Sequence, residues 1–183
     1  MKCNYKLPKL TKEEQQDMAS IKSTLSYIDR LQIQQRNSEN YGSRGRDMIY
    51  TSYFAKLKSL PKNIIPISIC GKAPDWYQGL QYKKLAPKYD FFMKWKENHD
   101  NDYYIKCFNE QVLNKLNAEQ VVKELDNLLL NETLAIDYSG DLKEVPRIAL
   151  ICYEKPSDFC HRHLVADWLN KNGVECKEFE DEI

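Results

Sequence analysis

The sequence lacks a long apolar run and a targeting signal. None of its 183 residues belongs to a stretch of about eighteen apolar residues, the length that a helix needs to cross a bilayer. Residues 1–6 (MKCNYK) also lack the apolar region and cleavage site of a secretory signal. The composition, 42% apolar and 30% charged, is typical of a globular protein with one domain of ordinary size. We therefore expect a cytoplasmic protein with no membrane partner.

The sequence also lacks paired cysteines. Its six cysteines are dispersed, and no two of them form a C-x-x-C motif. They are Cys3, Cys70, Cys107, Cys152, Cys160 and Cys176. In a reducing compartment such cysteines are free thiols rather than a disulfide framework, so an extracellular scaffold is not expected.

The formal net charge of the chain is zero, but its two halves carry opposite net charges. Up to Lys96 there are 18 Lys and Arg against 8 Asp and Glu, and from Glu97 onward 9 against 19. The basic half could bind an anionic partner, or the two halves could attract each other within one fold. No dense basic run or nucleic-acid motif accompanies the charge, which favours attraction within the fold.

Two regions of different character follow each other along the chain. Residues 11–36 begin with a capping box and continue with an apolar stripe at helical spacing, which predicts a long helix. This stripe packs either on its own domain or on a second copy of the chain, which would form a homodimer. Residues 37–46 are polar and predict a tether. We expect an N-terminal helix and tether over residues 1–46 and a domain over residues 47–183.

The second region predicts an α/β fold. Residues 48–54, 64–70, 147–153 and 174–179 are rich in β-branched, aromatic or other apolar residues and predict strands. Helical patterns lie between the second and third of these strands. The last of these predicted helices follows Asn117, which we expect to be its N-cap residue. Strands joined by helical crossovers imply a mainly parallel sheet of about four or five strands with helices on both faces.

The segment after the third predicted strand carries the candidate active site. A polar loop with a cap-type Ser157 or Asp158 precedes a helix that ends near Gly173, and Cys160-His161-Arg162 falls at its first turn. There, the helix dipole, Arg162 and an imidazole would lower the pKa of the Cys160 thiol. We take Cys160 and His161 as candidate catalytic residues and Arg162 as an anion ligand. Alternatively, Cys160 is only packed beneath the loop, Arg162 pairs with Glu154 or Asp158, and one histidine caps a backbone carbonyl.

A metal site at this segment is not expected. Cys152, Cys160, His161 and His163 could act as ligands, but Cys152 lies in a predicted strand. Adjacent helical residues such as Cys160 and His161 diverge by about 100° around the helix axis, which opposes a closed tetrahedral site. The sequence identifies no cofactor.

Further candidate ligand residues flank this site. The loop after Cys70 contains Lys72 and Trp76, a cation and an aromatic ring that could hold an anionic group and stack on a flat ligand. We also include Glu154, and Tyr50 and Ser52 on the first strand, which could line the floor of the site.

The motifs resemble a known family. Residues 150–154 (LICYE), Cys160-His161-Arg162 and residues 165–167 (VAD) are similar to the signature of the "domain of unknown function 488" family of bacterial, archaeal and phage proteins. Residues 49–54, 66–69, 71–76 and 85–87 agree as well, so the resemblance covers about residues 47–179. Many relatives have an Arg-Gly pair where this chain has Cys70-Gly71-Lys72. The resemblance implies a compact α/β domain with a Cys-His-Arg cluster and no established reaction.

Two functions follow as expectations. The first is a site for a small anionic ligand, such as a nucleotide, at the strand ends, with thiol-dependent catalysis left open. The second is a regulatory module that binds nucleic acid or protein through the basic first half and the N-terminal helix.

Overall fold

The structure is a computed structural model that describes residue 12, residues 48–137 and residues 146–180. The chain divides into two units, Met1–Gly45 and Arg46–Ile183, and the elements below belong to the second. The helix predicted over residues 11–36, apart from Lys12, and the tether predicted over residues 37–46 lie outside the described residues. The boundary near residue 46 stays a prediction.

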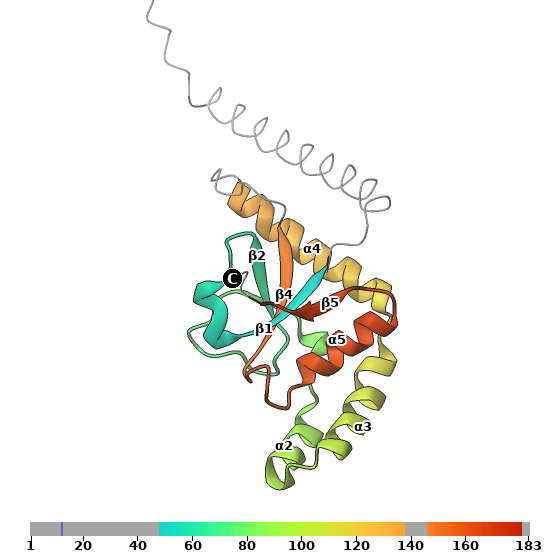
Figure 1. Cartoon of the computed structure of the whole chain (residues 1–183). Coiled ribbons are helices and arrows are strands. Elements are labelled where there is room, and N and C mark those ends of the chain that lie inside the picture. The colour runs from blue at the N-terminus through green and yellow to red at the C-terminus, as the bar shows by residue number, and fades with distance from the viewer. Residues whose placement is uncertain (1–11, 13–47, 138–145, 181–183) are drawn as a thin grey trace, which may run out of the picture. The chain divides into compact units, whose positions relative to one another are not determined.

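The fold is built on a five-stranded sheet in which all strands are parallel (Figure 1). The strand order is β3-β2-β4-β1-β5. The strands are β1 (Ile49–Tyr53), β2 (Ile64–Ser68), β3 (Leu80–Gln81), β4 (Arg147–Cys152) and β5 (Cys176–Glu178). Strand β4 is central and buried after its first residue, which explains its nearly continuous apolar sequence. The α/β class and the four predicted strands are confirmed, and the two-residue β3 was not predicted.

Helical segments connect the strands. They are η1 (Phe54–Ser59), η2 (Lys83–Leu85), α2 (Tyr89–Asn98), α3 (Asn101–Gln111), η3 (Leu113–Lys115), α4 (Ala118–Asp137) and α5 (His161–Lys171). The predicted cap Asn117 is confirmed, since its Oδ1 accepts the backbone N–H of Gln120 at 2.9 Å. Between α2 and α3, His99 adopts a left-handed backbone with φ 54°, so the two helices are separate. Within the described residues, no helix combines the length and apolar character that spanning a bilayer requires.

The two faces of the sheet are covered differently. One face packs against α2, α3, α4 and α5 through residues such as Ile67, Leu150 and Leu169. The other face packs against η1 and the loop of residues 71–79, through residues such as Phe54, Tyr77 and Ile151. Helices therefore cover both faces as expected, but among the described residues the second face has a 3-10 helix instead of an α-helix.

The topology singles out the carboxyl ends of β2 and β4. These strands are neighbours, yet β2 continues toward β3 on one side while β4 crosses to β5 on the other. Connections that leave adjacent parallel strands in opposite directions define a topological switch point, where open α/β sheets bind their ligands. Because β4 ends at Cys152 and is followed by the segment that leads to α5, the first turn of α5 lies near this point.

Candidate functional site

The first turn of α5 begins later than the sequence indicated. The helix begins at His161, and Cys160 is its N-cap residue, with an extended backbone at φ −150° and ψ 139°. Ser157 and Asp158 are not caps because they lie in a turn closed by the hydrogen bond from Asp158 N–H to the Lys155 carbonyl. Phe159 then packs against Trp95 and Tyr104, which anchors the chain before the helix. The Cys160 side chain is consequently set by extended rather than helical geometry.

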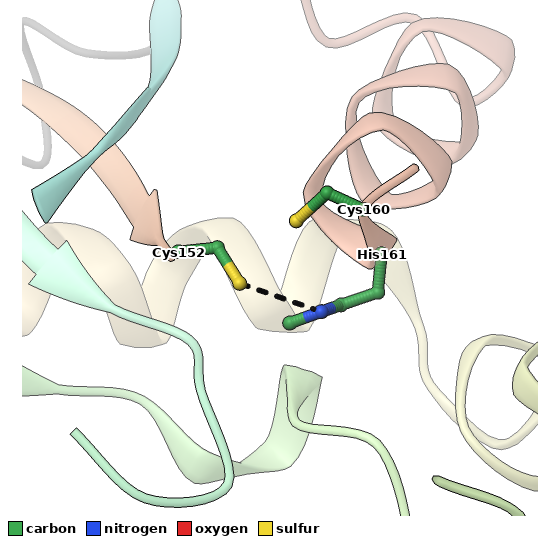
Figure 2. A group of neighbouring side chains, drawn as sticks. All are labelled: Cys152, Cys160 and His161. Carbon is green, nitrogen blue, oxygen red and sulfur yellow. Dashed lines mark hydrogen bonds between the residues drawn. The ribbon is translucent and has the colours of Figure 1, made fainter. Parts of the chain in front are cut away.

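Cys152, Cys160 and His161 converge at the end of β4. Their potential ligand atoms, two thiol sulfurs and one ring nitrogen, all lie within 4.8 Å of one another, and all three residues are buried. Figure 2 shows the side chains pointing toward a common region between β4 and the first turn of α5. The expectation that Cys160 and His161 diverge is therefore wrong, because the rotation of about 100° per residue applies only inside a helix.

The contacts of His161 fix which ring nitrogen carries the proton. Its Nε2 lies 3.1 Å from the carbonyl oxygen of Ile69, and its Nδ1 lies 3.6 Å from Cys152 Sγ. A carbonyl oxygen can only accept, so Nε2–H is the donor there. In the neutral imidazole, Nδ1 then has its lone pair directed toward the thiols.

Cys70 is a fourth member that sequence reasoning missed. It follows β2, and its Sγ lies 3.5 Å from Cys152 Sγ and 3.6 Å from the Ile151 carbonyl oxygen. The pairing of β2 with β4 brings Cys70 and Cys152 together, and strand order cannot be read from either segment alone. We call Cys70, Cys152, Cys160 and His161 the thiol cluster. The Glu154 carboxylate lies at its edge, with Oε2 accepting from Cys152 Sγ at 3.3 Å.

The acidities of the cluster members shift in opposite directions. A hydrogen bond from the Cys152 thiol lowers the pKa of Cys160, burial opposes this, and the His161 imidazole lowers it further. The same hydrogen bonding with Cys160 and Cys70, together with burial, raises the pKa of Cys152. Burial works against the charged form of His161, but hydrogen bonding and charge attraction with Cys160 raise its pKa. Outside the cluster, burial raises the pKa of Cys176 to about 12.

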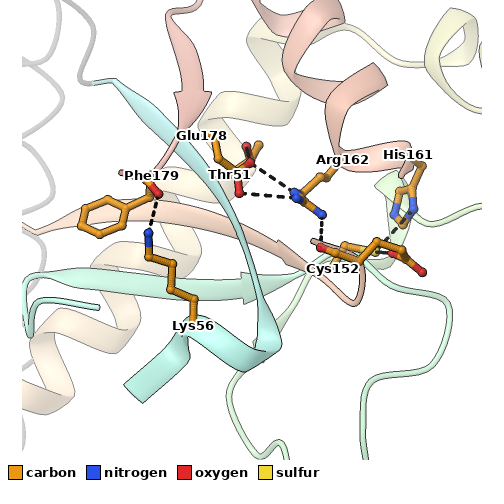
Figure 3. A network of polar contacts seen from close by, with 8 residues as sticks. Thr51, Lys56, Cys152, His161, Arg162, Glu178 and Phe179 are labelled. Atoms are coloured by element: carbon orange, nitrogen blue, oxygen red, sulfur yellow. Dashed lines mark hydrogen bonds and ion pairs between the residues drawn. The ribbon is translucent and has the colours of Figure 1, made fainter. Parts of the chain in front are cut away.

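Arg162 leaves the same helical turn in a different direction. Its side chain is 0% exposed, and its Nε and Nη2 lie 3.2 and 3.4 Å from the two carboxylate oxygens of Glu178. Thr51 Oγ1 donates to the same carboxylate at 2.6 Å, and Arg162 Nη1 donates to the Glu154 carbonyl at 2.6 Å (Figure 3). The alternative prediction that Arg162 pairs with the carboxylate of Glu154 or Asp158 is therefore wrong, because its carboxylate partner is Glu178. The sequence did not indicate Glu178 because β5 meets β1 only in the fold.

The loop after β2 reaches the same edge of the sheet. Tyr153, which follows β4, donates from its hydroxyl to the Lys72 carbonyl at 2.9 Å. Trp76 is 64% exposed and packs edge-on against Phe54 at a ring separation of 5.8 Å. The Lys72 ammonium is exposed and lies 3.4 Å from Asp75. The loop is therefore beside the end of β4, with its cation and Trp76 facing solvent.

Tyr50 and Ser52 occupy different positions on β1. The Tyr50 hydroxyl accepts a hydrogen bond from Arg147 Nη1 at 3.1 Å. Arg147 is the first residue of β4 and Cys152 is the last, so the Tyr50 hydroxyl lies at the opposite end of β4 from the thiol cluster. Ser52 pairs in register with Ile151, one residue before Cys152, and is fully buried. Among the described residues, its Oγ is a buried side-chain atom without a hydrogen-bond partner.

One comparison with known proteins gave a match. The family model DUF488-N3a, described as "Active DUF488-N3 subclade", matches residues 52–173, about two thirds of the chain. The matched segment contains the Cys160-His161-Arg162 motif and all of the thiol cluster, and the match agrees with the resemblance seen in the sequence. The search of curated proteins and the search of solved structures each found no match.

Proposed function

The chain belongs to the DUF488 family, and from that premise we propose that it binds a small anionic ligand at the carboxyl ends of β2 and β4 and reacts with it through the Cys160 thiol. The observation that carries the proposal is the convergence of the Cys160 thiol, a second thiol and an imidazole within 4.8 Å. This convergence lies at a topological switch point, the usual ligand position of parallel sheets.

The proposed reaction is a nucleophilic displacement. The Cys160 thiol transfers its proton to His161 Nδ1, and the resulting thiolate forms a bond to an electrophilic atom of the ligand. The bond to the leaving group breaks with its electron pair on the leaving group, which accepts the proton from the imidazolium. The carbonyl of Ile69 supports this role because it holds Nε2–H and stabilises the protonated ring.

The surrounding loops supply the features that an anionic ligand needs. The first turn of α5 has the positive end of the helix dipole. Lys72 adds an exposed ammonium, and Trp76 offers a ring face for a flat group such as a nucleobase. The unpartnered Ser52 hydroxyl is an additional candidate donor. Together these features favour a ligand with a phosphate or carboxylate and an aromatic part.

Arg162 and Glu154 take positioning roles in this proposal. The guanidinium is buried and already paired with Glu178, so its contribution to anion binding is indirect. Its bond to the Glu154 carbonyl fixes the segment after β4, which places the Glu154 carboxylate beside Cys152.

Alkylation of the full chain tests the proposal. In the native protein at neutral pH, iodoacetamide labelling read by peptide mass spectrometry should modify Cys160 faster than Cys107, a buried thiol of α3 that serves as internal control. Inorganic phosphate or a nucleoside monophosphate should slow labelling of Cys160. Because Cys160 is only 4% exposed, an unreactive buried thiol would resist labelling until the protein unfolds, and that outcome would overturn the proposal.

A further inference from the structure

We propose that Cys152, Cys160 and His161 form a binding site for one soft divalent cation of the zinc class. The inference goes beyond the proposed function and does not depend on it, because it requires only that two sulfurs and one ring nitrogen act as donors. Thiolate and imidazole are the ligands that such cations prefer over carboxylate and water.

The spacing of the donor atoms fits tetrahedral coordination. With metal–sulfur and metal–nitrogen bonds of about 2.3 and 2.0 Å, two donors of a tetrahedral zinc site are separated by roughly 3.5–3.8 Å. Cys152 Sγ and His161 Nδ1 are 3.6 Å apart, and the complete set of three atoms lies within 4.8 Å. Only small side-chain movements would therefore bring all three atoms to bonding distance.

The second ring nitrogen of His161 provides an independent observation. In metal sites, a ligating histidine almost always donates its other N–H to a carboxylate, a carbonyl or water, which fixes its tautomer and orientation. His161 has this arrangement, with Nε2 at 3.1 Å from the Ile69 carbonyl and Nδ1 directed at the thiols. The ring is also packed against Phe108, so its orientation is set by the fold.

Two further groups lie close enough to complete the coordination. Cys70 Sγ is 3.5 Å from Cys152 Sγ, and Glu154 Oε2 is 3.3 Å from the same sulfur. A fourth bond from Cys70 would give a closed site with three sulfurs and one nitrogen. Without such a bond, the fourth position would be open to water or a ligand.

A bound cation would lower the reactivity of Cys160. A metal-bound thiolate shares electron density with the cation and is a weaker nucleophile than the free thiolate, so the cation should slow alkylation of Cys160. The same cysteine would then react faster in the cation-free protein than in the cation-bound one.

Cobalt and zinc titrations of the chelator-treated full chain test the inference. One equivalent of Co²⁺ should give the absorption of tetrahedral thiolate coordination, and Zn²⁺ should displace it. In Cys152→Ser, Cys160→Ser and His161→Gln, affinity should fall by roughly 100-fold or more, since even a lost outer partner costs about 10–100-fold. Cys107→Ser and Cys176→Ser, which change buried thiols outside the cluster, should bind like the parent. Cys70→Ser and Glu154→Gln show which group completes the site.

The outcomes separate the two proposals. If the parent shows no Co²⁺ thiolate absorption, or if the folded Cys152→Ser and Cys160→Ser variants bind as tightly as the parent, the cation site is wrong. Circular dichroism identifies variants that fail to fold, and the two cysteine variants decide the question if His161→Gln is one of them. Alkylation of Cys160 in the chelated protein tests the proposed thiol chemistry separately. If Cys160 is labelled in the chelated protein, saturating Zn²⁺ should slow that labelling, and an unchanged rate would remove Cys160 from the cation site.

Discussion

The first turn of α5 contributes side chains to two neighbouring clusters of polar residues, which differ in how their members are paired. Cys160 and His161 lie toward β2 and β4, where they join Cys70 and Cys152 in the thiol cluster. Arg162 lies toward β1 and β5, where it joins Thr51 and Glu178. We call Arg162, Thr51, Glu178 and the Glu154 carbonyl the arginine network. Figure 3 shows Arg162, Thr51 and Glu178 together with Cys152 and His161 of the thiol cluster.

The two clusters differ in how completely their partners satisfy them. In the arginine network a fully buried cation meets both oxygens of a carboxylate, and the same carboxylate accepts a hydroxyl. Such closed pairing makes the loss of either partner costly to the fold and leaves little capacity for a ligand. In the thiol cluster, weak donors and acceptors contact one another at 3.5–3.6 Å, and the sulfurs keep lone pairs for an electrophile or a cation. Chemistry is therefore expected in the thiol cluster and stability in the arginine network.

The largest expected effect is in the arginine network. Arg162→Ala leaves the Glu178 carboxylate without its cation, so the free energy of unfolding should fall by about 3–5 kcal/mol in urea titrations. Arg162→Lys should recover only part of this loss because an ammonium lacks the planar fork that contacts Glu178 and the Glu154 carbonyl together. If Arg162→Ala keeps its stability and instead loses phosphate protection of Cys160, Arg162 binds the anion directly and the contrast between the clusters is broken.

A smaller effect on stability is expected in the thiol cluster. Cys160→Ala removes one buried sulfur and leaves a small cavity, which should cost about 1–2 kcal/mol. The same variant should lose the fast alkylation that we assign to this thiol. A loss of stability as large as that of Arg162→Ala would show that the thiol cluster is mainly structural.

The sequence predicted the main elements because they depend on local patterns. Arg147 to Cys152 is continuously apolar after its first residue, and this pattern alone indicates a strand buried on both faces. Asn117 has the side chain that caps a helix. By contrast, β3 has only two residues, Leu80 and Gln81, and is held by pairing with β2, so no local pattern marks it.

The candidate site was predictable only in part. Cys160, His161 and Arg162 are adjacent in sequence, and their place at the start of a helix follows from the pattern around them. Their partners come from other strands, Cys70 from the end of β2 and Glu178 from β5, and these contacts depend on strand order. The expected divergence of Cys160 and His161 was wrong for a local reason, namely that Cys160 is an extended cap residue and not part of the helix.

A third variant examines the outer part of the arginine network. Thr51→Val removes the hydroxyl that donates to Glu178 at 2.6 Å while keeping nearly the same side-chain volume. The ion pair with Arg162 remains, so the free energy of unfolding should fall by about 0.5–1.5 kcal/mol, the net value of one hydrogen bond. Urea titration of Thr51→Val, Arg162→Ala and the double variant measures the coupling between them. Strict additivity would show that the hydroxyl and the guanidinium do not form one network.

The smallest expected effect on stability is at Lys72, in the loop that lies beside the thiol cluster. Its ammonium is exposed and its ion pair with Asp75 is at the surface, so Lys72→Ala should change the free energy of unfolding by less than about 0.5 kcal/mol. The variant keeps the backbone carbonyl that accepts from Tyr153, so the loop should stay in place. If Lys72 contributes to binding an anion near Cys160, then phosphate should protect Cys160 from alkylation less in Lys72→Ala than in the parent. Asp75→Asn is the matched control, since it breaks the same ion pair but keeps the ammonium. Equal protection in the parent and in both variants would remove Lys72 from the ligand site while leaving the thiol chemistry intact.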